Sequence, residues 1–432
     1  MYSRIDHFNM IRGTATIINH LENLKPLCTK TGLIRSLRKH YKHSVEPVLN
    51  NYQVHDSIPT TFIVSRSCHD SEFMKFIQRF HELDIQNYMN ERMPAKQCTK
   101  NMWLVKPDAQ NQGRGIEVFR SDLQGIRRYL QEQPENTYWI IQKYLERPLL
   151  YRGRKFDIRM WAFATWKNEY FFYKEGYIRT SSYTYNIEDD WNYIHLTNNC
   201  LQQYGNMYGV YEEGNTLSFC EFAQYLREQY PALEINFEKD LLSRMKDLML
   251  DSYLATKNNL NPRRRINCFE LLGYDFMIDE DFRVWLIEVN TNPYLGIANK
   301  YIEGLMPKML NDLFELVLDP YIQPANKIPV RQIANRFEIL YNEKKGMNKR
   351  RNFEVSVYPI PVLSPYRLLP VKNKRIEVLR NAPTQKINSG RSNFCLSGSN
   401  KEEFKRLNVK SITHEVEIEK VVFVKVTIGT RS

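Results

Sequence analysis

The stretch at 269–290, FELLGYDFMIDEDFRVWLIEVN, decides the fold that this sequence predicts. It indicates two strands joined by a polar turn at 280–283, and the second arm, 284–289, is rich in β-branched and aromatic residues. With the turn centred between residues 281 and 282, Asp275 lies opposite Glu288. Residues that oppose each other on paired strands share a face of the sheet. The sequence therefore predicts a hairpin that brings two carboxylates to one point.

Side-chain alternation adds an amide to this pair of acids. Asn290 lies two residues after Glu288 and points to the same side, whereas Ile287 and Val289 point to the other side. Like charges this close repel, so Asp275 and Glu288 need a stabilising ligand, and hard oxygen donors suit Mg²⁺ bound to nucleotide phosphates. The pattern is also typical of a solvated hairpin with acids on its exposed face, and both interpretations remain open.

Composition and charge indicate a globular protein with an acidic partner. The chain has 432 residues, of which 42% are hydrophobic and 13% aromatic, which is enough for two or three domains. Lys and Arg number 61 against 49 Asp and Glu, a net charge of +12. Such a balance favours nucleic acid, an anionic membrane or an acidic protein surface as partner.

Three classes of protein lack support in the sequence. No apolar run approaches roughly 18 residues, so no membrane span is expected. The start, MYSRIDHFNMIRG, lacks the apolar core of a signal peptide. The seven cysteines are scattered without a C-x-x-C pair, which predicts reduced thiols in a cytosolic protein and neither disulfides nor a zinc site.

Changes in composition and in hydrophobic pattern along the chain predict four segments. A small N-terminal α/β lobe is expected over 1–95, a central lobe over 96–165, and a larger lobe with the hairpin over 166–325. The remainder, 326–432, reads as a basic and partly flexible extension, because it carries a basic run at 344–351 and a polar, Ser- and Asn-rich stretch.

A glycine-bearing loop is expected between strands at 102–105 and 116–119. Its sequence is KPDAQNQGRG, at 106–115. Such a loop can fold over phosphates with its backbone N–H groups. It lacks the G-x-x-x-x-G-K-[ST] spacing and is equally typical of an ordinary turn.

A strand expected at 155–165 carries charges in alternation. Lys155, Asp157 and Arg159 share one face, and the apolar residues between them share the other. Charges in an otherwise apolar strand are costly unless the polar face lines a cleft. A cleft and a solvent-facing strand both fit the pattern.

Other elements follow from the same periodicities. Helices are expected at 33–41, 71–89, 218–228, 237–256 and 306–318, and strands at 61–64 and 139–144. A hairpin is expected at 170–180, turning at Lys174–Gly176 and presenting Arg179 on its second arm. His195, beside a Leu-Thr pair, is interpreted as a packed or capping residue and not as a catalyst.

Together these features indicate phosphoryl transfer. Lys106, Lys143 and Lys155 can surround phosphates, and the acids of the hairpin can hold the metal that bridges them. The sequence shows no Ser/His/Asp order, no nucleophile elbow and no dinucleotide G-x-G-x-x-G.

Six blocks, in order, resemble those of the tubulin–tyrosine ligase-like family of ATP-grasp amino-acid ligases. They are LCTKTGLIRSL, WLVKPDAQNQGRGIEVF, IIQKYLERPLLYRGRKFDIRMW, YKEGYIRTSS, HLTNNCLQ and FELLGYDFMIDEDFRVWLIEVNTNP, and the resemblance runs from about residue 19 to 319. It implies an α/β (α+β) fold of the ATP-grasp type, with the nucleotide held between two lobes that contain antiparallel sheets.

The resemblance also implies roles for individual residues. The residues implied to bind ATP are Lys30, Lys106, Gln112, Gly113, Gln142, Lys143, Tyr144, Leu145, Lys155, Asp157, Thr197 and Asn198. The residues implied to be catalytic are Arg159, Arg179, Lys155 and Asp157, with the two arginines binding carboxylates of the amino acid or of the acceptor. The residues implied to bind Mg²⁺ are Asp275, Glu288 and Asn290.

The implied reaction joins an amino acid to a carboxylate of tubulin. The carboxylate attacks the γ-phosphate of ATP, and the amine of a free amino acid then attacks the acyl phosphate. Tubulin tails are acidic, so the net charge of +12 fits a tubulin partner. The resemblance further implies a monomer of the cytoplasm and cytoskeleton, including cilium or basal body, with neither nucleic acid nor membrane as partner.

Several alternatives stay open at this stage. Glutamate is the favoured amino acid because most of the family adds it, while RTSS, at 179–182, looks closest to the tyrosine-adding branch and glycine is a third choice. Gln203 stands where the family usually carries Lys, which leaves a non-catalytic microtubule-binding protein as an alternative. A ligase for small metabolites fits the basic surface less well.

Overall fold

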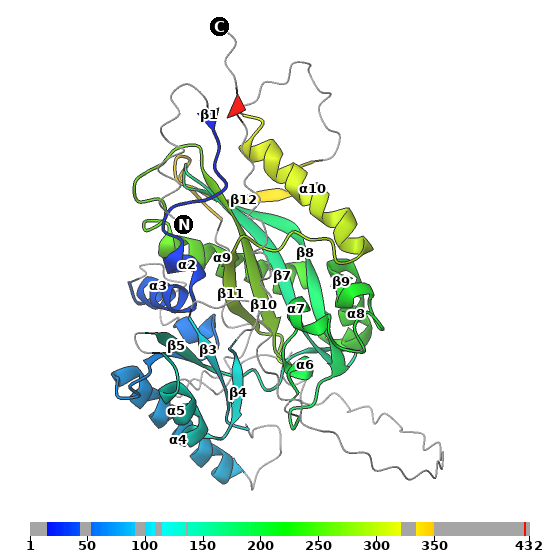
Figure 1. Cartoon of the computed structure of the whole chain (residues 1–432). Coiled ribbons are helices and arrows are strands. Elements are labelled where there is room, and N and C mark those ends of the chain that lie inside the picture. The colour runs from blue at the N-terminus through cyan, green and yellow to red at the C-terminus, as the bar shows by residue number, and fades with distance from the viewer. Residues whose placement is uncertain are drawn as a thin grey trace.

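Two antiparallel sheets, one small and one large, organise the chain (Figure 1). The computed structural model describes residues 15–43, 53–90, 100–108, 115–134, 137–189, 191–320, 334–349 and 427–428. Helices pack on both sheets, in agreement with the mixed α/β class and the antiparallel sheets expected from the sequence.

In the described residues the small sheet has the strand order β2-β5-β3-β4. Its strands are β2 (Thr61–Ser65), β5 (Tyr138–Lys143), β3 (Met102–Pro107) and β4 (Glu117–Arg120). Helices α4 (Ser71–Asn90) and α5 (Leu123–Gln131) pack on one face, where the rings of Trp103 and Phe76 meet edge to face with centroids 5.0 Å apart. Helix α3 (Lys30–His43) packs on the other face through Leu33 and Ile34.

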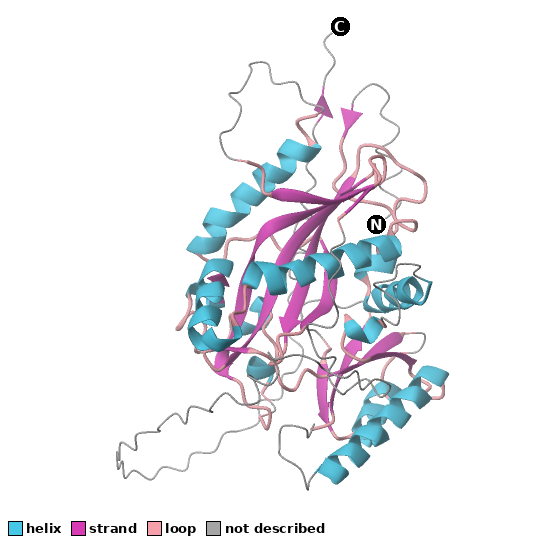
Figure 2. Ribbon diagram, turned by 180° about the vertical axis from the view of Figure 1, so that it is seen from behind, coloured by secondary structure: helices cyan, strands magenta, loops and turns pink. Residues whose placement is uncertain are grey.

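The large sheet has the order β11-β10-β7-β8-β12-β13, with β6 beside β7 and β9 beside β8. Its strands are β6 (Leu150–Tyr151), β7 (Arg154–Thr165), β8 (Glu169–Thr184), β9 (Thr216–Ser218), β10 (Phe269–Ile278), β11 (Val284–Thr291), β12 (Phe337–Asn342) and β13 (Met347–Asn348). Helices α9 (Ser243–Thr256) and α10 (Lys300–Val317) cover opposite faces of this sheet (Figure 2).

Strand β7 shows how alternation creates a polar surface inside the fold. Its residues Phe156, Ile158 and Met160 are fully buried in the core under α9. On the opposite face Trp161 and Phe163 pack under α10. The residues that precede them on this face, within 155–159, are charged. The alternation predicted from the sequence is confirmed, and these charged residues are buried.

The prediction of a hairpin at 170–180 is wrong, because this segment lies within one continuous strand, β8. The pairing with β7 shifts between Met160 and Ala162, so the residues expected to turn form an irregularity within the strand. Gly176 permits it: a Cβ there would lie 2.2 Å from the backbone oxygen of Arg159. Lys174 N donates to Arg336 O at 3.2 Å, which ties the irregularity to the chain next to β12.

The remaining expected elements are confirmed, with differences at their ends. The helix expected at 306–318 begins earlier, because Asn299 caps α10 by accepting from Ile302 N at 2.9 Å. The helix expected at 237–256 starts as a π-helical turn, η6 (Phe237–Leu242), before α9. Further elements are β1 (Ala15–Thr16), α2 (Lys25–Cys28), η2 (Val54–Asp56), α6 (Asn192–His195), α7 (Asn199–Gln202), η4 (Glu213–Asn215), α8 (Phe219–Gln229), η5 (Pro231–Leu233) and β14 (Thr427–Ile428).

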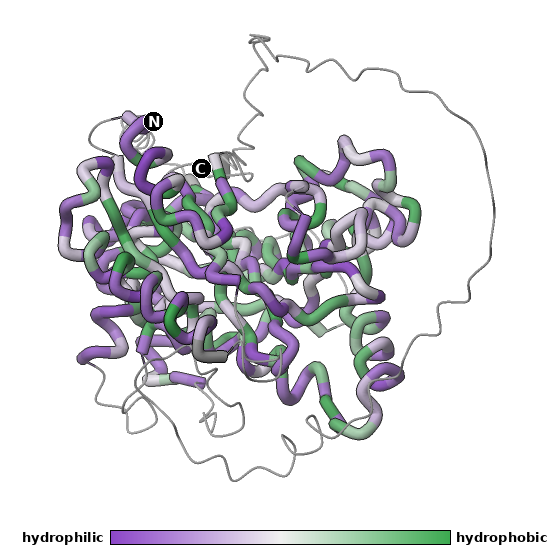
Figure 3. The backbone as a smooth tube through the Cα atoms, turned by 90° about the horizontal axis from the view of Figure 1, so that it is seen from below, coloured by the Kyte–Doolittle hydropathy of each residue, from purple (hydrophilic) through white to green (hydrophobic). Residues whose placement is uncertain are grey.

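The two sheets part between Lys143, at the end of β5, and Leu150, at the start of β6. The domain boundaries expected near 95, 165 and 325 stay predictions, although β12 places part of the expected extension at the edge of the large sheet. Hydrophobic and hydrophilic residues interleave along the chain (Figure 3). Within the described ranges, no helix combines the length and apolarity needed to cross a bilayer.

Candidate active site

A buried ion-pair network crosses strands β7, β8 and β10. Arg159 Nε lies 2.5 Å from Asp275 Oδ1, and its Nη2 lies 3.1 Å from Asp275 Oδ2. Arg179 Nε lies 2.5 Å from Asp157 Oδ1, and its Nη2 lies 3.1 Å from Asp275 Oδ1. The predicted residues Arg159, Arg179, Asp157 and Asp275 thus meet in one place, where each charge has an opposite partner.

This network shifts the acidity of its two carboxyl groups in opposite directions. Burial alone would raise the pKa of Asp275, but Arg159 and Arg179 outweigh it and hold that pKa below its usual range. Burial raises the pKa of Asp157 against the pull of Arg179. Thr197 donates its hydroxyl to Asp157 Oδ2, so this predicted residue also joins the network. Asn198, directly after Thr197, is half-buried at the start of α7.

The hairpin of β10 and β11 has the predicted register at its key point, because Asp275 pairs with Glu288. Closer to the turn the register shifts, so that Phe276 pairs with Leu286 and Ile287 is an extra residue of a bulge. Ile287 was expected to point away from Glu288, yet both line the same cavity. The bulge interrupts the strict alternation on which the expectation rested.

Asn290 bridges the two acids of the hairpin. Its Nδ2 donates to Glu288 Oε1 at 3.0 Å and to Asp275 Oδ2 at 3.3 Å. Burial and the neighbouring Asp275 raise the pKa of Glu288, and Lys30 opposes this shift. Among the described residues, no group of three His, Cys, Asp or Glu side chains could hold a metal ion. The candidate ligands here are two carboxylates, Asp275 and Glu288, and the amide of Asn290.

The chemistry of this donor set fits a hard divalent cation. Carboxylate and amide oxygens are ligands that Mg²⁺ accepts, and a cation would relieve the repulsion between the two acids. Glu288 and Asn290 line the cavity, whereas the Asp275 oxygens already accept from two guanidinium groups. Glu288 and Asn290 are therefore better placed than Asp275 to contact an ion in the cavity.

An open cavity lies where the two sheets face each other. It measures about 440 Å³ with its solvent-open space included. Its polar lining comes from α3, from the small sheet and from β11, through Lys30, Lys106, Gln142, Glu288 and Asn290. Its apolar lining includes Leu33, Ile34, Ile58, Ile140 and Ile287. The cavity thus offers an apolar wall next to cationic and anionic side chains.

Buried lysines make one side of this region cationic. Lys106 Nζ donates to Gln142 Oε1 at 2.7 Å. Burial lowers the pKa of Lys106 to about 8, while Glu288 opposes this shift and Lys30 adds to it. Burial likewise lowers the pKa of Lys155 to about 7, and the charge of Lys106 lowers it further. Desolvation of several cations at one place favours an anionic ligand that restores their charge.

One predicted nucleotide contact, Lys143, does not line the cavity. Lys143 directs its Nζ away from the cavity, onto Met102 O at 3.0 Å and onto Glu146. Strand alternation accounts for this, since Gln142 faces the cavity and its neighbour must face the other side. The phosphate contact implied for Lys143 stays a prediction, while Leu145 is half-buried after β5. Gln112 and Gly113 lie outside the described residues.

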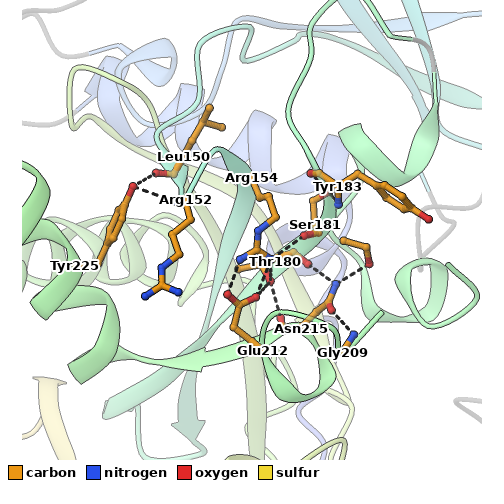
Figure 4. Close-up of polar contacts among 11 residues, drawn as sticks. Leu150, Arg152, Arg154, Thr180, Ser181, Tyr183, Gly209, Glu212, Asn215 and Tyr225 are labelled. Carbon is orange, nitrogen blue, oxygen red and sulfur yellow. Dashed lines mark hydrogen bonds and ion pairs between the residues drawn. The ribbon is translucent and has the colours of Figure 1, made fainter. Parts of the chain in front are cut away.

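Arg154 and Asn215, which the sequence analysis did not single out, make polar contacts next to the candidate site. Arg154, next to Lys155, binds both oxygens of Glu212 and donates to Ser181 O at 3.2 Å (Figure 4). Asn215 Nδ2 donates to Thr180 O at 3.0 Å, so the segment that contains η4 is held against β7 and β8. No local pattern in the sequence identifies Glu212 as the partner of Arg154, because the two residues lie 58 positions apart.

Comparison with known proteins agrees with these features. The model of the tubulin-tyrosine ligase family matches residues 14–327. "Tubulin glycylase 3B" of Tetrahymena thermophila is 31% identical over 282 residues, which cover 65% of this chain and 22% of that protein. "Protein polyglycylase TTLL10" of Mus musculus is 26% identical over 358 residues, which cover 78% of this chain and 48% of that protein.

A third relative is matched over most of its length. "Probable alpha-tubulin polyglutamylase Ttll1" of Tetrahymena thermophila is 28% identical over 354 residues, which cover 76% of this chain and 79% of that protein. By contrast, the chain spans less than half the length of the glycylase and the polyglycylase. Because the family model extends over well over half of the sequence, in the part that carries the site, this chain belongs to the tubulin-tyrosine ligase family.

Proposed function

We propose that this protein is an ATP- and Mg²⁺-dependent ligase that adds an amino acid to a carboxylate of tubulin through an acyl phosphate. The observation that carries the proposal is the cavity in which Lys106 of the small sheet meets Glu288 and Asn290 of the large sheet. Cations that hold phosphates beside acids that hold their metal are what phosphoryl transfer requires.

In this proposal ATP lies between the sheets in an ATP-grasp arrangement. Lys30, Lys106 and Lys155 hold its phosphates, and the apolar wall with Ile140 packs against the adenine, beside Gln142. A magnesium ion held by Glu288 and Asn290 would supply positive charge at the phosphate oxygens. The lowered pKa values of Lys106 and Lys155 support this assignment, because phosphate oxygens would restore both charges.

Arg179 is the residue best placed to bind a carboxylate substrate. Its Nε and Nη2 bind Asp157 and Asp275, and among the described residues its Nη1 has no hydrogen-bond partner. Nη1 can therefore bind the acceptor carboxylate or the carboxylate of the amino acid while the two ion pairs orient the guanidinium group. Arg159 has both of its hydrogen bonds on Asp275 and serves to hold that acid.

The added amino acid is proposed as glycine or glutamate. The relatives include a glycylase, a polyglycylase and a probable polyglutamylase, so the glutamate favoured from the sequence and the glycine alternative fit about equally. Tyrosine remains a third candidate on the basis of 179–182. The proposal places the protein in the cytoplasm at microtubules, including those of a cilium or basal body.

A non-catalytic microtubule-binding protein is the second candidate. "Inactive polyglycylase TTLL10" of Homo sapiens is 26% identical over 378 residues, which cover 78% of this chain and 54% of that protein. Gln203, where the resemblance expected a lysine, is exposed and donates weakly to Cys200 O at 3.4 Å. The complete pair of Glu288 and Asn290 favours the active enzyme over this candidate.

Mass spectrometry of tubulin tails tests the proposal. Tubulin is incubated with Mg-ATP, the protein and glycine, glutamate or tyrosine in separate reactions, beside a matched Glu288→Gln variant. A mass increment with one amino acid that is absent with the variant supports the ligase and identifies the amino acid. Unmodified tails in all reactions, with microtubule co-sedimentation retained, support the non-catalytic candidate instead.

A further inference from the structure

A buried cluster around His195 holds Lys155 in place. His195 Nδ1 lies 2.7 Å from the Tyr144 hydroxyl, and Lys155 Nζ donates to that hydroxyl oxygen at 2.9 Å. Lys155 also donates to the backbone oxygen of His195 at 2.8 Å. Two of the three N–H bonds of Lys155 thus have partners in the described part of the chain, and the third is left for a ligand.

The hydrogen bonds determine the tautomer of His195. Its Nε2 lies 2.5 Å from the backbone oxygen of Asp189, and a carbonyl oxygen only accepts, so Nε2 carries a proton. Burial lowers the pKa of His195, and the hydrogen bond to Asp189 O opposes this shift without cancelling it. With the pKa below its ordinary value, the neutral ring predominates at pH 7. Nδ1 therefore accepts the Tyr144 proton, which leaves a lone pair of the Tyr144 oxygen for Lys155.

The same cluster connects the two sheets. Arg120, in β4, donates to Ile187 O at 2.6 Å and to Asp189 O at 3.3 Å. Tyr144 directly follows β5 of the small sheet, whereas Lys155 belongs to β7 of the large sheet. The segment 187–189 therefore ties β4 to the imidazole that orients Tyr144.

We propose that His195 is a positioning residue for Lys155: as the Nε2–H tautomer held by Asp189 O, it orients the Tyr144 hydroxyl so that its oxygen fixes the Lys155 ammonium beside Lys106. This inference rests on the proposed function, because it assigns Lys155 to the phosphates of ATP. It replaces the sequence-based interpretation of His195 as a packed or capping residue with a role in orienting another side chain.

The neighbours of the imidazole support the neutral form. The titratable and charged groups that face it are Tyr144, Tyr185, Lys155, Arg120 and Asp189. Arg120 and the protonated form of Lys155 oppose a second proton on the ring, whereas the charge of Asp189 favours it. Burial raises the pKa values of Tyr144 and Tyr185. A second buried proton on His195 would repel Lys155 and would remove the acceptor that orients Tyr144.

Two near-isosteric variants separate positioning from packing. His195→Asn keeps an oxygen close to the Nδ1 position, which can accept from Tyr144, whereas His195→Gln keeps a donor close to the Nε2 position for Asp189 O. Affinity for Mg-ATP is measured by titration calorimetry, together with thermal unfolding, in wild type, both variants and Tyr144→Phe. We expect His195→Gln and Tyr144→Phe to weaken ATP binding about tenfold, and His195→Asn to retain binding within about threefold.

A second readout tests the tautomer without nucleotide. The ¹⁵N spectrum of labelled histidine, with the His195 signal assigned by its loss in His195→Asn, should show a neutral Nε2–H ring at pH 7 that does not titrate near 6.5. A ring found in the Nδ1–H or doubly protonated form overturns the inference. The inference is also overturned if wild type binds ATP and all three variants bind it with the same affinity. Wild type that binds no ATP overturns the proposed function and this inference with it.

Discussion

Arg159 and Asp275 lie 116 positions apart in the sequence and face each other on adjacent strands, with Arg159 Nε 2.5 Å from Asp275 Oδ1. Both side chains are buried, so each charge depends on the other for compensation. Arg179 binds the same carboxylate from the other side of β7. The position of the proposed carboxylate-binding group therefore depends on pairs formed between strands that are distant in sequence.

Removing one member of this pair should destabilise the fold. Arg159→Met leaves Asp275 buried with a single cation, so the free energy of unfolding should fall by about 3 kcal/mol. In Arg159→Met/Asp275→Asn the loss should be smaller than the sum of the two single losses, because neither charge is left without its partner. Urea unfolding of nucleotide-free protein measures all three variants, and strictly additive losses would contradict the coupling.

The irregularity in β8 should depend on the absence of a side chain at Gly176. Gly176→Ala places a methyl group against Arg159 O and should lower the free energy of unfolding by about 2 kcal/mol. Gly304→Ala is the control, because a Cβ there meets no atom within 4 Å and the position lies on an exposed part of α10. This control should gain about 0.5–1 kcal/mol from its helix propensity. Equal Tm values for the two variants would refute the account.

Glu288→Gln should remove turnover while leaving the fold intact. The substitution is isosteric at a residue whose pKa is already raised by burial and by Asp275, so folding loses little. ATP turnover with tubulin should fall at least about 100-fold, since a charged metal ligand is lost. Glu303→Gln, at an exposed position of α10, is the charge-matched control and should keep full turnover. Turnover by Glu288→Gln at the wild-type rate would rule out this role.

ATP binding should take up protons at pH 8. Free Lys155, with its pKa lowered to about 7, and free Lys106, with its pKa lowered to about 8, are partly neutral there, and phosphate charges favour their protonated forms. Uptake of ~1 proton or slightly more per ATP is expected at pH 8, falling toward zero at pH 6. Calorimetry in buffers of different ionisation enthalpy measures it, and Lys155→Met should lose most of the uptake. Proton release at pH 8 would contradict the assignment.

The two lysines of neighbouring strands should behave differently. Lys106→Met removes a cation that lines the cavity, so Mg-ATP binding should weaken about 100-fold. Lys143→Met removes contacts to Met102 O and Glu146 on the far side, so it should lower the Tm with little change in ATP affinity. Fluorescent nucleotide binding and thermal unfolding, measured on both variants, test this. Equal losses of affinity would show that Lys143 reaches the nucleotide after all.

Local patterns in the sequence predicted the arrangement of several side chains at the candidate site. The register that opposes Asp275 to Glu288 and the charged face of Lys155, Asp157 and Arg159 are both confirmed. Period-two alternation suffices for such predictions, because it fixes the face to which each residue of a strand points. The same rule, applied to Gln142 and Lys143, would have shown that only one of them lines the cavity.

The sequence by itself determined the strands β7, β10 and β11, the register that opposes Asp275 to Glu288 and membership of the family. The tertiary structure alone decided that β8 continues past Gly176 as one strand, that Arg159 and Arg179 share Asp275, and that the Tyr144 hydroxyl lies between His195 and Lys155. Spacing along the chain fixes only the direction of a side chain relative to its own strand. Partners across strands depend on pairing, bulges and burial that bring together residues distant in sequence, such as Arg159 and Asp275, which are 116 positions apart.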